Sequence, residues 1–362
     1  MFLAREINTI FLMLGNGCNM NCRYCLQHPL VHHQITQKIN PDIYNFIEQV
    51  KRENGKKRLG IHFFGGEPLI YFNQIKEIVK NVDGVDYSII TNGKAMTDEM
   101  VDFFNDHRIP VTISWDGKNV LETRGFDVFD ERYPLRRRLL RLDLLGLSAV
   151  MSAKAYPKEI MESFQEISDE YFKLHGYGIR LNVDEIFDTG LDDKDLLNMD
   201  YERVRHEMEE MTNLCISHLK SGGTRNLSDI YINMFFEQIK EYCNNDGKYE
   251  RVMCCCGNGY STLNMDLDGN LYSCHNTSQA IGTIYDSYFK YLAKVIEGDN
   301  TKSRQTECSA CPAVSCCQGG CKLLSDEVRS ETYCKLKQAV FGTVVLTLQE
   351  YGAEYGNQRN DS

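Results

Sequence analysis

This sequence of 362 residues lacks a long apolar run and the pattern of a signal peptide, and it has fewer basic than acidic residues. No apolar run approaches 18 residues, so we expect no transmembrane helix and no membrane partner. The N-terminal segment carries an acidic residue, Glu6, and no small-residue cleavage site before Cys18, which predicts a first strand and no signal peptide. Positive charge is also scarce, because 51 acidic against 40 basic side chains give a net charge of −11. That balance argues against nucleic acid as the main partner.

Cysteine, by contrast, is abundant, with fifteen residues. Three lie within residues 18–25 and ten within residues 254–334, while Cys215 and Cys243 stand alone and are expected to be buried small hydrophobes. Without a secretory signal we expect a cytoplasmic protein with reduced thiols and no disulfide framework. Adjacent cysteines within the second group suit metal ligation better than disulfides.

Strand and helix patterns alternate about six times before residue 190, which predicts a parallel sheet with helices outside, open or curled into a barrel. The expected strands are residues 7–14, 60–64, 85–93, 109–117, 147–153 and 177–186. The intervening helices are expected within residues 40–54, 72–82, 97–108, 129–146 and 156–175. Asn40 and Pro41 supply a cap and a first-turn proline for the first of these helices.

The remainder of the chain has a different character. Two charged amphipathic helices are expected within residues 192–243, then a hairpin that turns at Asp268 and Gly269, and a closing helix from residue 335. The expected domains are a barrel at 1–190, a helical bridge at 191–250, a cysteine-rich module at 251–340, and a closing helix with a frayed tail at 341–362.

The first cysteine group has three thiols, Cys18, Cys22 and Cys25, directly after the first expected strand. Three thiolates can bind three irons of a [4Fe–4S] cube and leave the fourth iron for a small molecule. The position is suitable, since barrels place their chemistry at the carboxyl ends of strands. A zinc site completed by His28 is the rival interpretation.

These residues resemble the signature of the radical S-adenosylmethionine (SAM) enzymes, CxxxCxxC with the aromatic Tyr24 before the last cysteine. Three further motifs follow in the order of that family: GGEP at 65–68, TNG at 91–93 and SWDG at 114–117. The resemblance covers about residues 5–190. It implies an α/β fold, a partial (β/α)6 TIM-like barrel, and a SAM molecule bound to the free iron of a [4Fe–4S] cluster.

The resemblance also implies roles for individual residues. Gly65 and Gly66 would bind the methionine amino group, since glycine lets the backbone approach a ligand closely. Glu67 would either stabilise that ammonium group or fix the loop. The other expected SAM contacts are Ser114 and Arg124, to the ribose and carboxylate, and Tyr24, near the adenine. The alternative for Arg124 is a solvated surface arginine.

The second cysteine group resembles the seven-cysteine SPASM domain, which in its full form carries two auxiliary [4Fe–4S] clusters. By this resemblance, the nearer cluster takes Cys274 and Cys321 with one or two of Cys254, Cys255 and Cys256. The farther cluster takes Cys308, Cys311, Cys317 and Cys334, and Cys316 is expected to be a spare. The triple cysteine departs from the usual spacing. Metal sites would supply folding energy to a module with a thin core.

The resemblance implies a 5′-deoxyadenosyl radical that abstracts hydrogen from a residue of a ribosomally made peptide. The outcome is a thioether or carbon–carbon cross-link, epimerisation or oxidation. Sulfatase maturation is the alternative, but those members carry aspartate where this chain has His275. His275 acts as a base, a ligand or a structural histidine. Since the first strand begins near residue 7, we expect no N-terminal leader-binding domain, so a separate protein presents the leader or the enzyme binds it directly.

Three interpretations complete the predictions. Asp184 and Glu185 are acid/base candidates, with simple polar loop residues as the alternative. The basic run at 136–138 is either a solvated helix face or a docking site for an acidic leader or for the expected reductant, flavodoxin or ferredoxin. A non-catalytic zinc or iron–sulfur binding protein is the remote alternative, and it predicts no SAM site.

Overall fold

The computed structural model describes residues 7–27, 38–54, 58–188, 194–223, 226–244, 261–298, 305–321 and 324–360. Its centre is a nine-stranded sheet with the order β6-β5-β4-β3-β2-β1-β7-β8-β9. The first six strands run parallel to one another: β1 (Thr9–Met13), β2 (Gly60–Phe64), β3 (Asp86–Thr91), β4 (Val111–Ser114), β5 (Leu145–Met151) and β6 (Arg180–Glu185). The predicted α/β fold with a parallel sheet is confirmed.

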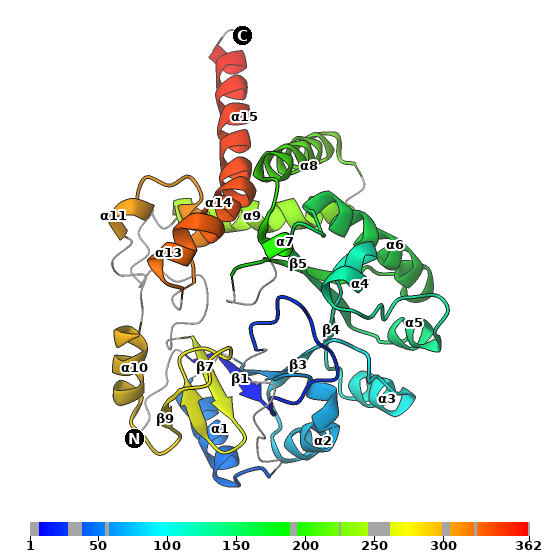
Figure 1. Ribbon diagram of the computed structural model, residues 1–362, viewed down its shortest axis with the longest axis vertical. Coiled ribbons are helices and arrows are strands. Elements are labelled where there is room, and N and C mark those ends of the chain that lie inside the picture. The colour runs from blue at the N-terminus through cyan, green and yellow to red at the C-terminus, as the bar shows by residue number, and fades with distance from the viewer. Residues whose placement is uncertain are drawn as a thin grey trace.

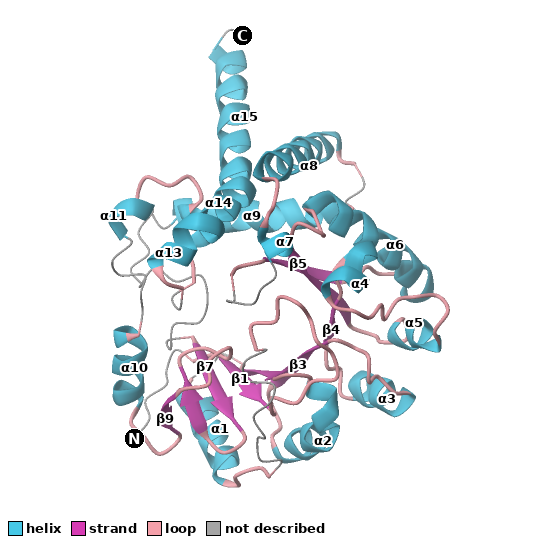
Figure 2. Ribbon diagram, in the orientation of Figure 1, coloured by secondary structure: helices cyan, strands magenta, loops and turns pink. Residues whose placement is uncertain are grey.

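Helices cover the outer face of this curved sheet, as Figures 1 and 2 show. They are α1 (Asp42–Glu53), α2 (Phe72–Asn81), α3 (Asp98–Asp106), α5 (Pro134–Leu139) and α6 (Pro157–His175). The short 3-10 turns η1 (Pro68–Tyr71) and η2 (Gly117–Asn119) and the short helix α4 (Val120–Thr123) lie in the loops that follow β2 and β4. The basic run lies on α5, where Arg136 pairs with Glu170 and Arg138 with Asp98. These arginines therefore bind neighbouring helices of the same chain.

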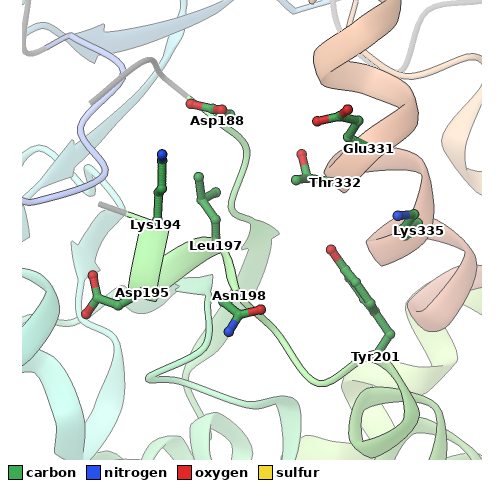
Figure 3. Close-up of a pocket in the computed structure, with 9 residues that line it drawn as sticks. All are labelled: Asp188, Lys194, Asp195, Leu197, Asn198, Tyr201, Glu331, Thr332 and Lys335. Carbon is green, nitrogen blue, oxygen red and sulfur yellow. The ribbon is translucent and has the colours of Figure 1, made fainter. Parts of the chain in front are cut away.

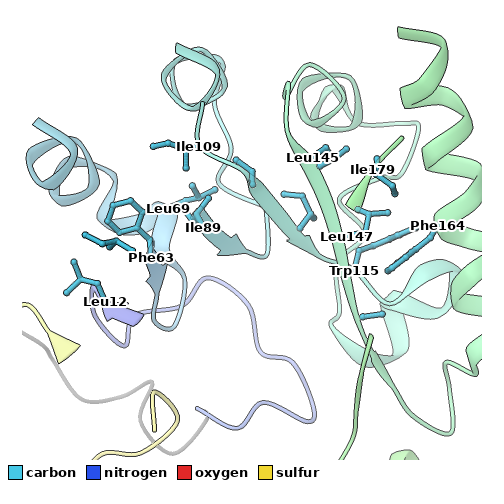
Figure 4. Close-up of a cluster of buried hydrophobic side chains, with 14 of the residues drawn as sticks. Leu12, Phe63, Leu69, Ile89, Ile109, Trp115, Leu145, Leu147, Phe164 and Ile179 are labelled. Atoms are coloured by element: carbon cyan, nitrogen blue, oxygen red, sulfur yellow. The ribbon is translucent and has the colours of Figure 1, made fainter. Parts of the chain in front are cut away.

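The two faces of each strand have different environments. Leu12 and Phe63 are buried, and Figure 4 shows such side chains packed between the strands and the helices. Their neighbours Phe11 and His62 point to the opposite, concave face and are only half-buried. This alternation follows from the two-residue period of a strand. The core therefore lies under the helices, and the concave face is open to a ligand.

The predicted hairpin extends the same sheet. β7 (Thr262–Asp266) runs parallel to β1, and β8 (Asn270–Tyr272) and β9 (Ala280–Thr283) follow antiparallel. The turn falls where the sequence predicts it, and Gly269 has a φ of +86°, which glycine adopts most readily. Helix α10 (Tyr288–Glu297) comes next, and the sequence analysis did not predict it.

The segment predicted to be a helical bridge contains α7 (Lys194–Leu197), α8 (Tyr201–Ser221) and α9 (Leu227–Asn244). Helix α8 packs against α6, α9 and the C-terminal helix. Cys215 is buried there as expected, whereas the prediction of a buried Cys243 is wrong, because this residue lies exposed near the end of α9. No helix within the described ranges is long and apolar enough to cross a membrane.

The C-terminal region begins with two short helices, α11 (Gln305–Cys308) and α12 (Val314–Cys317). A long helical stretch follows: α13 (Asp326–Val328), the π-helical turn η4 (Arg329–Tyr333), α14 (Cys334–Lys337), a second π-helical turn η5 (Gln338–Gly342) and α15 (Thr343–Asn360). The closing helix thus begins about nine residues before the predicted start and extends into the tail that was expected to fray. Its last part, α15, projects from the body (Figure 1).

Candidate functional site

The first three cysteines lie in the loop that follows β1. Cys18, Cys22 and Cys25 are close enough to influence one another electrostatically. Burial raises the pKa of Cys22 to about 11, and the nearby Arg124 guanidinium opposes that rise. Among the described side chains, no three metal-binding groups converge as closely as a single ion requires, and His28 lies outside the described residues. Cysteine thiolates are the ligands of iron–sulfur clusters, so three neighbouring thiols could hold three irons of a cube and leave the fourth free.

The two glycines of the GGEP motif join the loop after β2 to the cysteine loop. A Cβ at Gly65 would lie 2.4 Å from the carbonyl oxygen of Gly15, and one at Gly66 would lie 2.5 Å from that of Gly17. The close approach permits backbone hydrogen bonds from Gly66 N to Gly15 O (2.9 Å) and from Glu67 N to Gly17 O (2.8 Å). Both glycines are therefore required by loop–loop packing, a reason that the sequence analysis did not identify.

Glu67 fixes a third loop in the same place. Its buried carboxylate accepts hydrogen bonds from Leu69 N (2.9 Å), Asn92 N (2.8 Å) and the Thr91 hydroxyl. Burial raises its pKa, and these donors oppose the rise. Asn92 in turn places its side-chain amide 3.9 Å from the Cys18 sulfur. Of the two roles that the sequence left open for Glu67, these contacts support the one that fixes the loop.

Asp116, within the SWDG motif, is a buried residue that joins the loop after β4 to the cysteine loop. The sequence did not identify it as a site residue. Its carboxylate accepts hydrogen bonds from the Tyr24 hydroxyl, the Thr123 hydroxyl (2.7 Å) and Val150 N (2.9 Å). It also forms an ion pair with Arg124 at 3.0 Å. Arg124 is only 8% exposed and lies over the Tyr24 ring. The alternative that Arg124 is a solvated surface residue is therefore wrong.

Tyr24 packs its ring into the hydrophobic core, and its hydroxyl donates a hydrogen bond to Asp116. It anchors the cysteine loop from a position between two thiols. Ser114, the other expected SAM contact, ends β4 and pairs in register with Ser148 of β5. Asn182 of β6 donates to the Ser148 hydroxyl at 3.4 Å. A polar row thus crosses three neighbouring strands on the concave face, at the end of β4 and within β5 and β6.

Asp184 continues this polar face on β6. Solvent reaches its side chain, yet protein atoms surround it closely enough that burial raises its pKa. Glu185 adds to the rise, whereas Lys337 and Arg124 oppose it. Asn182 donates a hydrogen bond to its carboxylate at 2.9 Å. Asp184 therefore has the position and the environment of a proton acceptor on the open face.

Glu185 faces the other way. It is buried and forms an ion pair with Lys337 of α14, whose ammonium group also lies 4.4 Å from the centre of the Phe341 ring. Because its carboxylate is held in this pair, Glu185 connects β6 to the C-terminal helical stretch. This arrangement favours a structural role over the acid/base role that the sequence suggested.

His275 lies on the concave face. Its ring stacks on Phe11 with centroids 4.6 Å apart and meets Phe64 edge-on at 4.4 Å. Its carbonyl oxygen accepts a hydrogen bond from the Gln27 side chain, two residues after Cys25. The residue after Cys274 is thus placed on the open face beside the cysteine loop, where a substrate could contact it.

The C-terminal region gathers a second set of thiols. Cys308, Cys311 and Cys334 interact electrostatically, and Cys311, Cys317 and Cys321 belong to one small apolar cluster. The four expected ligands of the farther auxiliary cluster therefore come from one region, and their thiol chemistry fits an iron–sulfur group. The candidates Cys254, Cys255 and Cys256 lie outside the described residues. Cys274 is half-buried and accepts a hydrogen bond from Asn276 N, and Cys316 is buried.

A pocket of about 660 Å³ lies between the segment that follows β6 and the C-terminal helical stretch (Figure 3). Residues from the β6–α8 region line one side, and Glu331, Thr332 and Lys335 line the other. Asp195 in its wall accepts a hydrogen bond from Arg23 of the cysteine loop at 2.6 Å. The cavity is therefore structurally connected to the loop that carries the first three thiols.

Comparisons with known proteins agree with this geometry. Residues 12–123 match the family model of the radical SAM superfamily. The radical SAM cyclopropyl synthase TigE of Paramaledivibacter caminithermalis is 33% identical over 135 residues, which are 32% of this chain and 28% of TigE. The cysteine-type anaerobic sulfatase-maturating enzyme of Clostridium novyi is 23% identical over 124 residues, 31% of this chain and 33% of that enzyme. The matches thus span about a third of these curated relatives.

Two solved structures share the fold over most of the chain. Native anSMEcpe with bound AdoMet has a TM-score of 0.64 at 15% identity, covering 95% of this chain and 99% of that one. Streptococcus suis SuiB bound to precursor peptide SuiA has a TM-score of 0.59 at 15% identity, covering 88% and 72%. The sequence match shows a radical SAM domain at residues 12–123, and the two structures show a shared fold over most of the chain.

Proposed function

We propose that the protein is a radical SAM peptide maturase, which abstracts hydrogen from a residue of a ribosomally made peptide. One observation carries the proposal: the GGEP, TNG and SWDG loops all converge on the cysteine loop. Gly66, Asn92 and the Thr123 carbonyl each hydrogen-bond to it. Motifs far apart in the sequence thus build one site around three thiols.

The cofactors follow from the donor groups. Cys18, Cys22 and Cys25 would hold a [4Fe–4S] cluster and leave one iron for SAM. The polar side chains on the concave face of β4 to β6, with Ser114, and the GGEP loop would surround the SAM molecule. When bound, the cluster and SAM would supply a 5′-deoxyadenosyl radical that removes hydrogen from the substrate. The two auxiliary clusters would use the thiols of the C-terminal region, with Cys274 and Cys321 in the nearer one.

The chain's own residues position and protect this chemistry. Glu67 and Asp116 lock the surrounding loops through buried hydrogen bonds, and Tyr24 and Arg124 anchor the cysteine loop to β4. The open concave face would hold the peptide. Asp184 would accept the proton that leaves when the substrate radical is oxidised, because its carboxylate is accessible and has a raised pKa.

The substrate and partners are inferred from the relatives. SuiB is recorded with its precursor peptide and anSMEcpe with a Cys-containing peptide, Cp18Cys, which supports a peptide substrate here. A cross-link, an epimerisation or an oxidation would fit the same site. Formylglycine formation on a sulfatase is the alternative, supported by the shared fold, but this chain has His275 where those enzymes have aspartate. We further propose a flavodoxin or ferredoxin reductant, a leader-binding partner and a reducing, cytoplasmic location.

The expected domain division, with a barrel at 1–190 and a SPASM module at 251–340, accompanies this proposal. The test is to incubate the anaerobically reconstituted enzyme, SAM and dithionite with short peptides encoded beside its gene. Tandem mass spectrometry should find a peptide that has lost hydrogen or, when the reaction is run in D2O, one that has gained a single deuterium at an inverted residue, with one 5′-deoxyadenosine formed per event. A sulfatase-derived peptide converted to formylglycine instead would support the alternative. Integral zinc and no SAM cleavage would support a non-catalytic protein.

A further inference from the structure

The long C-terminal helical stretch contains two π-helical turns, η4 and η5. In such a turn the backbone bonds run between residues five apart, and these turns are rare and often functional. At η4 the Cys334 N–H donates to the Arg329 carbonyl, five residues earlier. One residue more than an α-helical turn is therefore accommodated directly before a cysteine of the second thiol set.

The π turn decides which side chains meet. In an α-helix, residues five apart point about 140° away from each other, since each residue turns the helix by about 100°. At η4 the extra residue brings the two side chains together, and the Arg329 Nη1 donates to the Cys334 sulfur at 3.3 Å. The same pair of residues is thus joined by a backbone and a side-chain hydrogen bond.

The guanidinium group of Arg329 is buried and fixed by two carboxylates. The residue is only 7% exposed, and its Nη2 donates to the Glu307 carboxylate at 2.7 Å. Asp326 lies 3.5 Å from its Nε. Its guanidinium also acts electrostatically on Cys308, which ends α11. A buried cation therefore contacts one of the four expected ligands of the farther auxiliary cluster and lies within electrostatic range of a second.

The second π turn repeats the pattern. Its first residue, Gln338, places its side-chain amide nitrogen 3.8 Å from the Cys311 sulfur. Each π turn thus begins with a residue whose side chain donates to a cysteine sulfur, one charged and one neutral. Because the same arrangement occurs twice in one helical stretch, we infer that the π turns place hydrogen-bond donors next to the cysteine sulfurs.

We propose that Arg329 is a positioning residue that raises the reduction potential of the iron–sulfur cluster bound by this thiol set. The proposal rests on the cluster assignment of the proposed function. Reduction adds one electron, and hence one negative charge, to the cluster and its sulfurs without a proton. A buried cation and an N–H···S hydrogen bond both stabilise that added charge. The cluster would therefore accept an electron from a substrate radical more readily.

The test is an EPR-monitored redox titration of the whole, anaerobically reconstituted protein, with dithionite as the electron source. We expect R329Q to lower one midpoint potential, with at least a tenfold change in the oxidised-to-reduced ratio at a fixed potential, or about 59 mV for one electron. R329K should restore part of the shift. E307Q should move the same midpoint upward, because it removes a carboxylate that offsets the cation.

R136Q is the matched control, since Arg136 is also ion-paired and partly buried, but on the outer helices of the barrel. Unchanged midpoints in R329Q, or equal shifts in R136Q, would overturn the proposal. If R329Q loses iron, the E307Q variant tests the proposal instead. A midpoint potential in E307Q that is unchanged or lower would then contradict the proposal. SAM cleavage is measured in parallel: a protein without cleavage but with the Arg329 shift would contradict only the proposed function.

Discussion

Removing the charge of Asp116 tests how the cysteine loop is held. This residue is 2% exposed and receives hydrogen bonds from Tyr24, Thr123 and Val150 in addition to its ion pair with Arg124. D116N keeps the size of the side chain and removes its charge. Arg124 is then a buried cation without its counterion, and the tyrosine that lies between two thiols loses a charged acceptor.

The expected cost follows from the burial of both partners. Breaking a buried ion pair by removing one charge destabilises a protein by about 3–5 kcal/mol. An unfolding entropy of about 2.1 cal/mol/K per residue over 362 residues converts this to a Tm lower by about 4–7 °C. The double variant D116N/R124M should regain much of the loss, because it leaves no unpaired charge. D98N, at an exposed pair of arginines, should change Tm far less.

The measurement is the thermal unfolding of the four proteins under anaerobic conditions, followed by circular dichroism, with iron analysis of each sample. D116N should also bind less iron at the first site, because Tyr24 anchors that loop. A Tm for D116N equal to that of D98N would refute the claim that the buried ion pair holds the loop. So would a double variant less stable than D116N alone.

Three further predictions concern the loops, the proton acceptor and the contact between barrel and C-terminal helix. G66A should lose about four irons per protein, because its Cβ would lie 2.5 Å from backbone oxygen, while G352A, with open space around its Cβ, should keep them. D184N should abolish peptide modification but keep SAM cleavage. In the wild type, the rate of modification should rise with pH through a pKa above 3.8, because Asp184 must be ionised to accept a proton. A flat pH profile would contradict this role. E185Q should leave Lys337 buried without its counterion and lower the free energy of unfolding by about 3–5 kcal/mol in urea melts, and a loss below about 1 kcal/mol would show that the pair contributes little.

The sequence predicts local structure well where the signal is local. The strand expected at 60–64 is found at Gly60–Phe64, and the turn at Gly269 is found as predicted. Both depend on neighbours in the chain: alternation and a glycine with positive φ. The parallel alternation also sufficed to predict the sheet, because short connections between strands and helices leave few topologies.

Features that depend on distant residues could not be predicted in this way. The pairing of β7 with β1 and the ion pair between Glu185 and Lys337 join residues far apart in the sequence. Asp116 was missed although it lies within a recognised motif, since nothing local shows that it faces Arg124. The π turns leave no propensity signal, so the contact between Arg329 and Cys334 was also invisible.

The central claim is that Cys18, Cys22 and Cys25 hold an iron–sulfur cluster whose free iron binds SAM. The direct measurement is EPR of the dithionite-reduced protein with and without SAM, beside the variant in which all three cysteines are alanine. SAM should change the spectrum of one cluster and be cleaved to 5′-deoxyadenosine, and the triple variant should lack about four irons and both effects. SAM cleavage that persists in the triple variant, or a wild type in which SAM leaves every cluster signal unchanged, would contradict the claim.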